Sequence, residues 1–140
     1  MTIASGLYSH AEGSFTSASG NYSHTEGDNT IASGKYSHSE GYKTNASEIY
    51  AHAEGFRTTA SKEAAHAECY NTIASGFYAH AEGKQTTASG YSSHAEGDNT
   101  IAGYRYQHVQ GKYNDNKENN LFEIGNGTAD NARFNAFEVD

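Results

Sequence analysis

The sequence of 140 residues contains no proline, no tryptophan and a single cysteine, Cys69. One cysteine excludes an internal disulfide and a cysteine-based zinc site. Leu, Ile, Val and Phe together account for only 16 residues, about 11%, which is below the usual fraction for a globular core. Apolar runs extend over only a few residues, so we expect neither membrane insertion nor a signal-peptide core within this sequence.

Basic residues are also scarce. Nine Lys and Arg stand against 17 Asp and Glu, and the formal net charge of -8 argues against nucleic acid as a partner. The mean hydropathy of -0.82 and the 15 glycines would suggest disorder, because little apolar area offsets the chain entropy. The absence of proline and the presence of 11 Tyr and 6 Phe argue instead for an ordered structure.

An internal repeat of 14 residues organises the chain and spans residues 1–111 as about eight units. Every histidine belongs to it: His10, His24, His38, His52, His66, His80, His94 and His108. Two positions after each histidine stand Glu12, Glu26, Glu40, Glu54, Glu68, Glu82, Glu96 and finally Gln110. Residues 112–140 break the period and form a separate non-repeat segment.

Each unit divides into two halves with the pattern small-x-small-x-Gly, as in Ser9–Gly13 and Thr16–Gly20. Alternation over five positions followed by glycine predicts a short strand and a turn. Two strands per unit make one coil of an all-β parallel β-roll, and eight coils stacked at about 4.8 Å give a rod of roughly 38 Å. The threonine that begins each second half belongs to the inward row, which argues against an outward ice-binding face.

The outward positions differ between the two predicted sheets. One sheet presents His and Glu in every coil, and this uniformity indicates a contact between symmetry-related chains rather than a solvent face. We therefore predict that the His and Glu positions form a polar ladder at a trimer axis. The competing arrangement places the other sheet on the axis, with its outward row of Ile3, Ser17, Ile31, Asn45, Thr59, Ile73, Thr87 and Ile101.

The coils Tyr8–Gly13 and Thr30–Gly34 resemble the head repeats of trimeric autotransporter adhesins related to the YadA head, and the same repeats in phage and prophage tail fibres. This resemblance implies a left-handed parallel β-roll in a parallel homotrimer. In the adhesin heads the axis positions are usually Val and Ile, where this sequence has His and Glu. The run from Ile124 to Ala136 resembles the junction that follows such repeats in prophage tail proteins, ahead of a self-cleaving chaperone domain.

The candidate chemistry is repetitive. Eight equivalent copies, seven with His and Glu and the last with His108 and Gln110, argue against catalysis, which needs one asymmetric site, so we expect no enzyme, no cofactor and no metal. A metal held by His and carboxylates in one layer is the alternative to a hydrogen-bonded ladder. A row of tyrosines stands two positions before the histidines. This row is interpreted either as a ladder at the turn edge or as a platform on which sugars stack. Its members are Tyr8, Tyr22, Tyr36, Tyr50, Tyr78 and Tyr106.

Together these features predict a structural and adhesive module of a trimeric fibre. The leading hypothesis is a phage or prophage tail fibre that attaches to a host-surface glycan or protein and is located on the virion tail. The alternatives are the head of a bacterial trimeric autotransporter adhesin, exposed at the cell surface, and the non-catalytic shaft of a glycan-processing tailspike.

Overall fold

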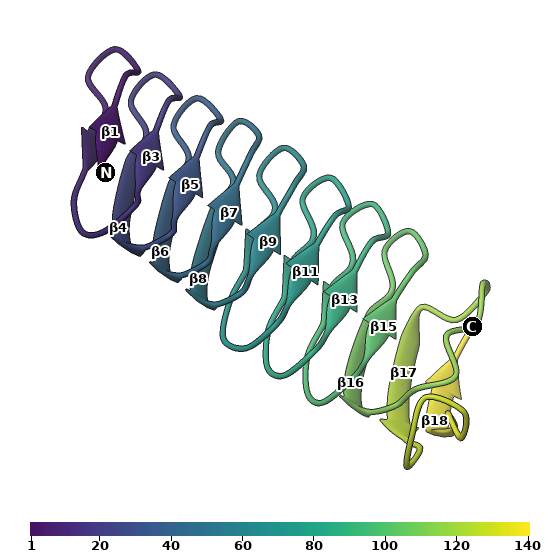
Figure 1. The fold of residues 1–140 in the computed structure, drawn as a ribbon. Coiled ribbons are helices and arrows are strands. Elements are labelled where there is room, and N and C mark those ends of the chain that lie inside the picture. The colour runs from purple at the N-terminus through teal and green to yellow at the C-terminus, as the bar shows by residue number, and fades with distance from the viewer.

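A computed structural model describes residues 1–140 as a stack of flat coils, with the two termini at opposite ends of the stack (Figure 1). The structure is built of strands and turns, and it contains no helix long and apolar enough to cross a membrane. The predicted all-β parallel roll with a 14-residue coil is thereby confirmed.

Two parallel sheets form the broad faces of the stack. The first sheet contains β1 (Ile3–Ala4), β3 (Ser17–Ala18), β5 (Ile31–Ala32), β7 (Asn45–Ala46), β9 (Thr59–Ala60), β11 (Ile73–Ala74), β13 (Thr87–Ala88) and β15 (Ile101–Ala102). The second contains β2 (His10–Ala11), β4 (His24–Asp28), β6 (His38–Tyr42), β8 (His52–Phe56), β10 (His66–Ala67), β12 (His80–Ala81), β14 (His94–Ala95), β16 (His108–Lys112), β17 (Phe122–Asn126) and β18 (Asn135–Val139). Within the repeat each residue pairs with the residue 14 positions later, as His38 does with His52.

The space between the sheets is filled by small side chains. Ala18, Ala32 and Ala46 are fully buried from the first sheet, and Ala53 and Ala67 face them from the second. The threonine row is also buried, from Thr16 through Thr100, with exposures of 0–1%. This confirms the predicted inward placement of that row, and Thr2 in the terminal coil is its exposed exception. Methyl and hydroxyl groups therefore fill most of the space between the sheets, and only the last coil buries a larger side chain, that of Gln107.

Both turns of every coil contain a non-glycine residue in the left-handed region. At the first turn this residue is a tyrosine in most coils, with φ of 59° at Tyr50, and at the second it is a residue such as Asn29, also with φ of 59°. A non-glycine residue in this region costs roughly 1–2 kcal/mol. Hydrogen bonds between coils offset that cost, because the amide of Tyr36 donates to the carbonyl of Asn21 at 2.9 Å and that of Asn29 to Ser14 at 2.8 Å.

Glycine stands in every coil but one where the chain leaves the His/Glu positions of the second sheet. Gly41 has φ of +105°, and a Cβ built there would lie 2.2 Å from the carbonyl oxygen of Gly55 in the next coil. Cys69 occupies the equivalent position of the fifth coil with φ of 78°. The bare backbone at this row lets successive coils approach closely, and it leaves a side-chain-free strip beside the glutamates.

The C-terminal segment, residues 112–140, continues the second sheet and then closes it. β17 pairs in parallel with β16, and β18 returns antiparallel to β17. Glu123 of β17 is paired with Val109, so a carboxylate occupies a position that holds a small apolar or hydroxyl side chain in the repeat. The segment thus buries a carboxyl side chain where the repeat buries small apolar or hydroxyl side chains.

Glu123 is fully buried and accepts four hydrogen bonds. The donors are the side-chain amides of Gln107 at 3.1 Å, Asn114 at 2.5 Å and Asn120 at 3.2 Å, and the backbone amide of Lys117 at 2.9 Å. A buried carboxylate is tolerated when donors surround it in this way. These bonds tie the loop between β16 and β17 to the end of the roll.

We expect Glu123→Ala to lower the free energy of unfolding by about 3 kcal/mol, because it leaves several buried donors without an acceptor. Urea unfolding measures the loss, and limited proteolysis should show cleavage after residue 112. Glu118→Ala, at an exposed position of the same loop, is the matched control and should leave both measurements unchanged. Equal stability of the two variants would contradict this role of Glu123.

Candidate functional site

The histidines form one continuous column on the second sheet. Each stands at the first position of a strand from β2 to β16, and in-register pairing places its imidazole over that of the next coil. From His24 to His94 the ring centroids are 4.7–4.8 Å apart, with interplanar angles of 0–13°. The end pairs are more tilted, at 31° for His10 and His24 and 47° for His94 and His108.

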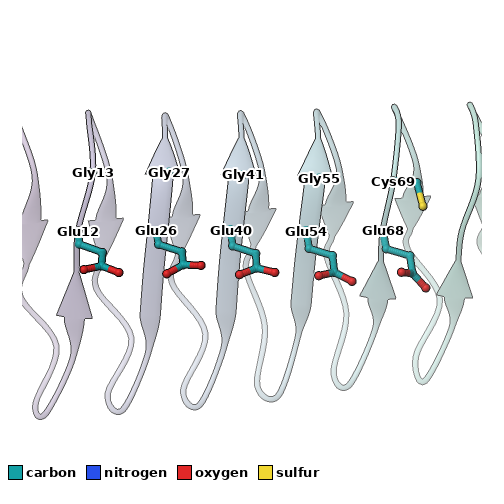
Figure 2. Close-up of a pocket in the computed structure, with 10 residues that line it drawn as sticks. All are labelled: Glu12, Gly13, Glu26, Gly27, Glu40, Gly41, Glu54, Gly55, Glu68 and Cys69. Atoms are coloured by element: carbon teal, nitrogen blue, oxygen red, sulfur yellow. The ribbon is translucent and has the colours of Figure 1, made fainter.

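The glutamates form a second column beside the histidines. Two positions along a strand return to the same face of a sheet, so each carboxylate lies next to its coil's imidazole. Figure 2 shows the side chains of Glu12, Glu26, Glu40, Glu54 and Glu68 in one line, all pointing the same way. With the adjacent glycines and Cys69 they line an open groove of about 790 Å³.

Imidazole and carboxylate approach each other mainly between consecutive coils. The Nε2 atom of His80 lies 3.0 Å from Oε1 of Glu68, and that of His94 lies 3.2 Å from Oε1 of Glu82; both are hydrogen bonds. The separation grows to 3.7 Å between His66 and Glu54. The predicted ladder therefore has its two columns side by side, with hydrogen bonds between them in part of the stack. Its location at a trimer axis stays a prediction.

Unpartnered nitrogen atoms remain along the column. The Nε2 atoms of His24, His38, His52, His66 and His108 are shielded from solvent and have no hydrogen-bond partner. Burial is the main cause that lowers the pKa of His38 and of His52, and the neighbouring imidazole adds to it in each case. Nearby glutamates act in the opposite direction without reversing the shift. Both rings are consequently neutral at pH 7.

The predicted tyrosine row is present as a stack in the first half of the rod. Tyr8, Tyr22, Tyr36 and Tyr50 follow one another with ring centroids 5.1–5.3 Å apart, and all four are exposed. Ala64 then interrupts the row. A row of exposed rings with this spacing presents a ribbed aromatic edge along four coils.

Tyr91 completes the aromatic row in the second half, although the spacing had not singled it out. Its ring packs edge-on against Tyr78 at 5.4 Å and against Tyr106 at 5.9 Å, filling the coil where Ser92 occupies the row position. Because Tyr91 stands one residue before that position, the 14-residue period does not detect it. Only the path of the turn places its ring between the other two.

A second aromatic stack at the opposite turn was also missed. Tyr42, Phe56 and Tyr70 stack at 5.1 Å with interplanar angles of 3–21°. Lys43 and Arg57 lie over the first two rings, at 5.2 and 5.3 Å from the centroids. The 14-residue spacing of these three aromatics was the available signal, but the row is short.

The fold and these columns define a class: a parallel β-solenoid that repeats the same outward side chains in every coil. Residues 11–37 and 81–102 match the YadA head domain repeat, in two copies. No curated protein matches the chain. The chain therefore carries YadA-like head repeats, as the residues of its coils indicated, and the coils between the two matched stretches have the same register and turn geometry.

The lowered pKa values of His38 and His52 make stability depend on pH. In the unfolded chain a histidine has a pKa near 6.5, so between that value and the lower folded pKa the unfolded state binds more protons. Stability is thus fully present above pH 6.5 and falls as the pH drops toward the folded pKa. We expect urea midpoints, measured in EDTA, to decrease from pH 7.5 to 5.5, a window above most carboxylate titration.

The matched variant for this experiment is His38→Gln/His52→Gln, which removes the two titrating rings and retains polar side chains of similar reach. Its urea midpoint should change less over the same pH window than that of the unaltered chain. An equally steep dependence in both proteins would assign the effect to other groups.

The tyrosine row lacks a ring at Ala64, so a tyrosine introduced there tests whether stacking along the row stabilises the protein. Ala64 has φ of 52°, close to the 59° of Tyr50 and 58° of Tyr78, so a tyrosine fits the same backbone. We expect Ala64→Tyr to raise the free energy of unfolding by about 0.5–1.5 kcal/mol through ring stacking. Ser92→Tyr is the control: Tyr91 already occupies the space between the neighbouring rings, so this change should give no gain. Equal effects on the thermal midpoint would reject the continuous row.

Proposed function

We propose that this chain is a non-catalytic adhesive module of a surface-exposed trimeric fibre. The observation that carries the proposal is the repetition of each outward group in coil after coil, because a stack of equivalent groups suits extended contact and offers no single asymmetric reaction centre. The YadA-like head repeats support the same role, since heads of this kind are trimeric adhesins at cell surfaces.

Within this class we favour a phage or prophage tail fibre that attaches to a host surface. The support is the C-terminal segment, whose run from Ile124 to Ala136 resembles the junction that follows such repeats in prophage tail proteins. The head of a bacterial trimeric autotransporter adhesin is the second candidate, because the YadA head repeat is equally consistent with it.

The stacked tyrosines are the proposed contact surface for a host glycan or protein. Tyr8 is 75% exposed and Tyr50 58%, so their rings are free to pack on the apolar face of a sugar. In a glycan-array screen of the intact protein, we expect Tyr22→Ala/Tyr36→Ala to lose any bound glycan. Tyr42→Ala/Tyr70→Ala, on the opposite turn, should retain it. Retention by both variants would exclude the tyrosine row as the adhesive surface.

Two arguments support a homotrimer: the interior of a single chain gives little hydrophobic stabilisation, and the repeat family is trimeric. Small side chains contribute little hydrophobic stabilisation per coil, so a further interface along the rod is needed. We place the His/Glu column at that interface, as its uniformity suggests, with one layer of three pairs contributed by each coil. Light scattering should then return a mass of about 45 kDa, three times the 15.0 kDa chain.

The polar axis is tested by replacing His52 and Glu54 with Val and Ile. On the axis, packed apolar side chains should preserve or strengthen the trimer, because a buried ionic network is often no more stable than a hydrophobic one. The same exchange on the other sheet, Thr59→Val/Ser61→Ile, should promote aggregation. If light scattering shows the reverse pattern, the isoleucine-bearing sheet forms the axis and the His/Glu column faces water.

A further inference from the structure

The His/Glu column contains four separate sets of three ligand atoms that have the chemistry of a transition-metal site. Within each set the imidazole nitrogens and carboxylate oxygens all lie within 4.8 Å of one another. The sets are Glu12/His24/Glu26, Glu40/His52/Glu54, His66/Glu68/His80 and Glu82/His94/Glu96. No side chain belongs to two sets, so they can be filled independently.

Glu40, His52 and Glu54 form the best prepared of these sets. All three residues are half-buried, and the Nε2 atom of His52 is shielded from solvent without a hydrogen-bond partner. With its ring proton on Nδ1, this imidazole presents the lone pair of Nε2 beside two carboxylates, with the ligand atoms of the set within 4.8 Å of one another. In the set that contains His94, by contrast, the imidazole already bonds to Glu82 at 3.2 Å.

The charge of the groove favours a cation. Consecutive glutamates repeat with every coil, and no Lys or Arg forms an ion pair with any of them: the Lys and Arg ion pairs join Lys84 to Asp98, Lys117 to Asp115 and Glu138, and Arg133 to Asp130. A divalent ion between two carboxylates would reduce their mutual repulsion.

We propose that the groove binds zinc-like divalent ions through imidazole and carboxylate ligands, first at Glu40, His52 and Glu54. Nitrogen and oxygen ligands at about 2.0–2.2 Å suit zinc, whereas magnesium and calcium prefer oxygen alone. The flexible glutamate side chains close the remaining distance, and water completes the shell. The imidazoles of the first two sets, His24 and His52, are two coil steps of 4.8 Å apart, so ions bound in these two sets would not share a coil.

The test is calorimetric titration of the EDTA-treated, exhaustively dialysed full chain with zinc chloride, and separately with magnesium and calcium chloride. Glu40→Gln/Glu54→Gln removes two ligands and two charges. Glu48→Gln/Glu118→Gln removes two charges at exposed positions outside the groove and is the matched control. We expect the first variant to bind one zinc equivalent per chain fewer, or to bind that equivalent at least tenfold more weakly, while the control matches the unaltered chain.

Two further measurements keep the proposal open to refutation if the first variant folds poorly. Cobalt added to the unaltered chain should give visible absorption bands, and zinc should shift the ¹⁵N resonance of His52 Nε2. Equal zinc loss in both variants, equal binding of magnesium, or an unshifted His52 resonance would each overturn the site.

Discussion

In-register stacking of the backbone is the constraint on which this structure depends. Each coil hydrogen-bonds to the next, as when the amide of His10 donates to the carbonyl of Ser23 at 3.0 Å, and the 14-residue length fixes which residues meet. Any side chain therefore lies directly over its counterpart in the next coil. This geometry produces rows of identical groups. A coil longer or shorter than 14 residues would break the register between neighbouring coils.

The same stacking limits what the interior can contain and where stability comes from. Alanine, serine and threonine fill most of the space between the sheets of the repeat, so each coil gains little from hydrophobic burial. Backbone hydrogen bonds between coils and stacked rings along the turns also contribute to stability. The left-handed tyrosines illustrate the balance: each costs conformational energy, but its amide and its ring both contact the adjacent coil.

Stacking also gives the His/Glu column its chemistry. Burial, and then the neighbouring imidazole 4.7–4.8 Å away, lower the pKa of His38 and His52, whose rings lie beside a line of carboxylates. A surface of this kind can contact an identical surface, and it can hold cations. Both possibilities follow from equivalent groups repeated at a fixed step, which is also why an asymmetric catalytic site is not expected.

The period of the sequence by itself determined the coil, the inward threonines and the adjacency of the histidines, because in a parallel stack a 14-residue spacing translates directly into contact. Tyr91 lies outside that period, and only the folded turn shows its ring between Tyr78 and Tyr106. Glu123 lies in the segment without a repeat, so its four donors could not be assigned before the loop was placed. The tertiary structure likewise decided that His80 bonds to Glu68 while the Nε2 atom of His52 has no partner, because small tilts of the rings and carboxylates, which no spacing encodes, set those distances.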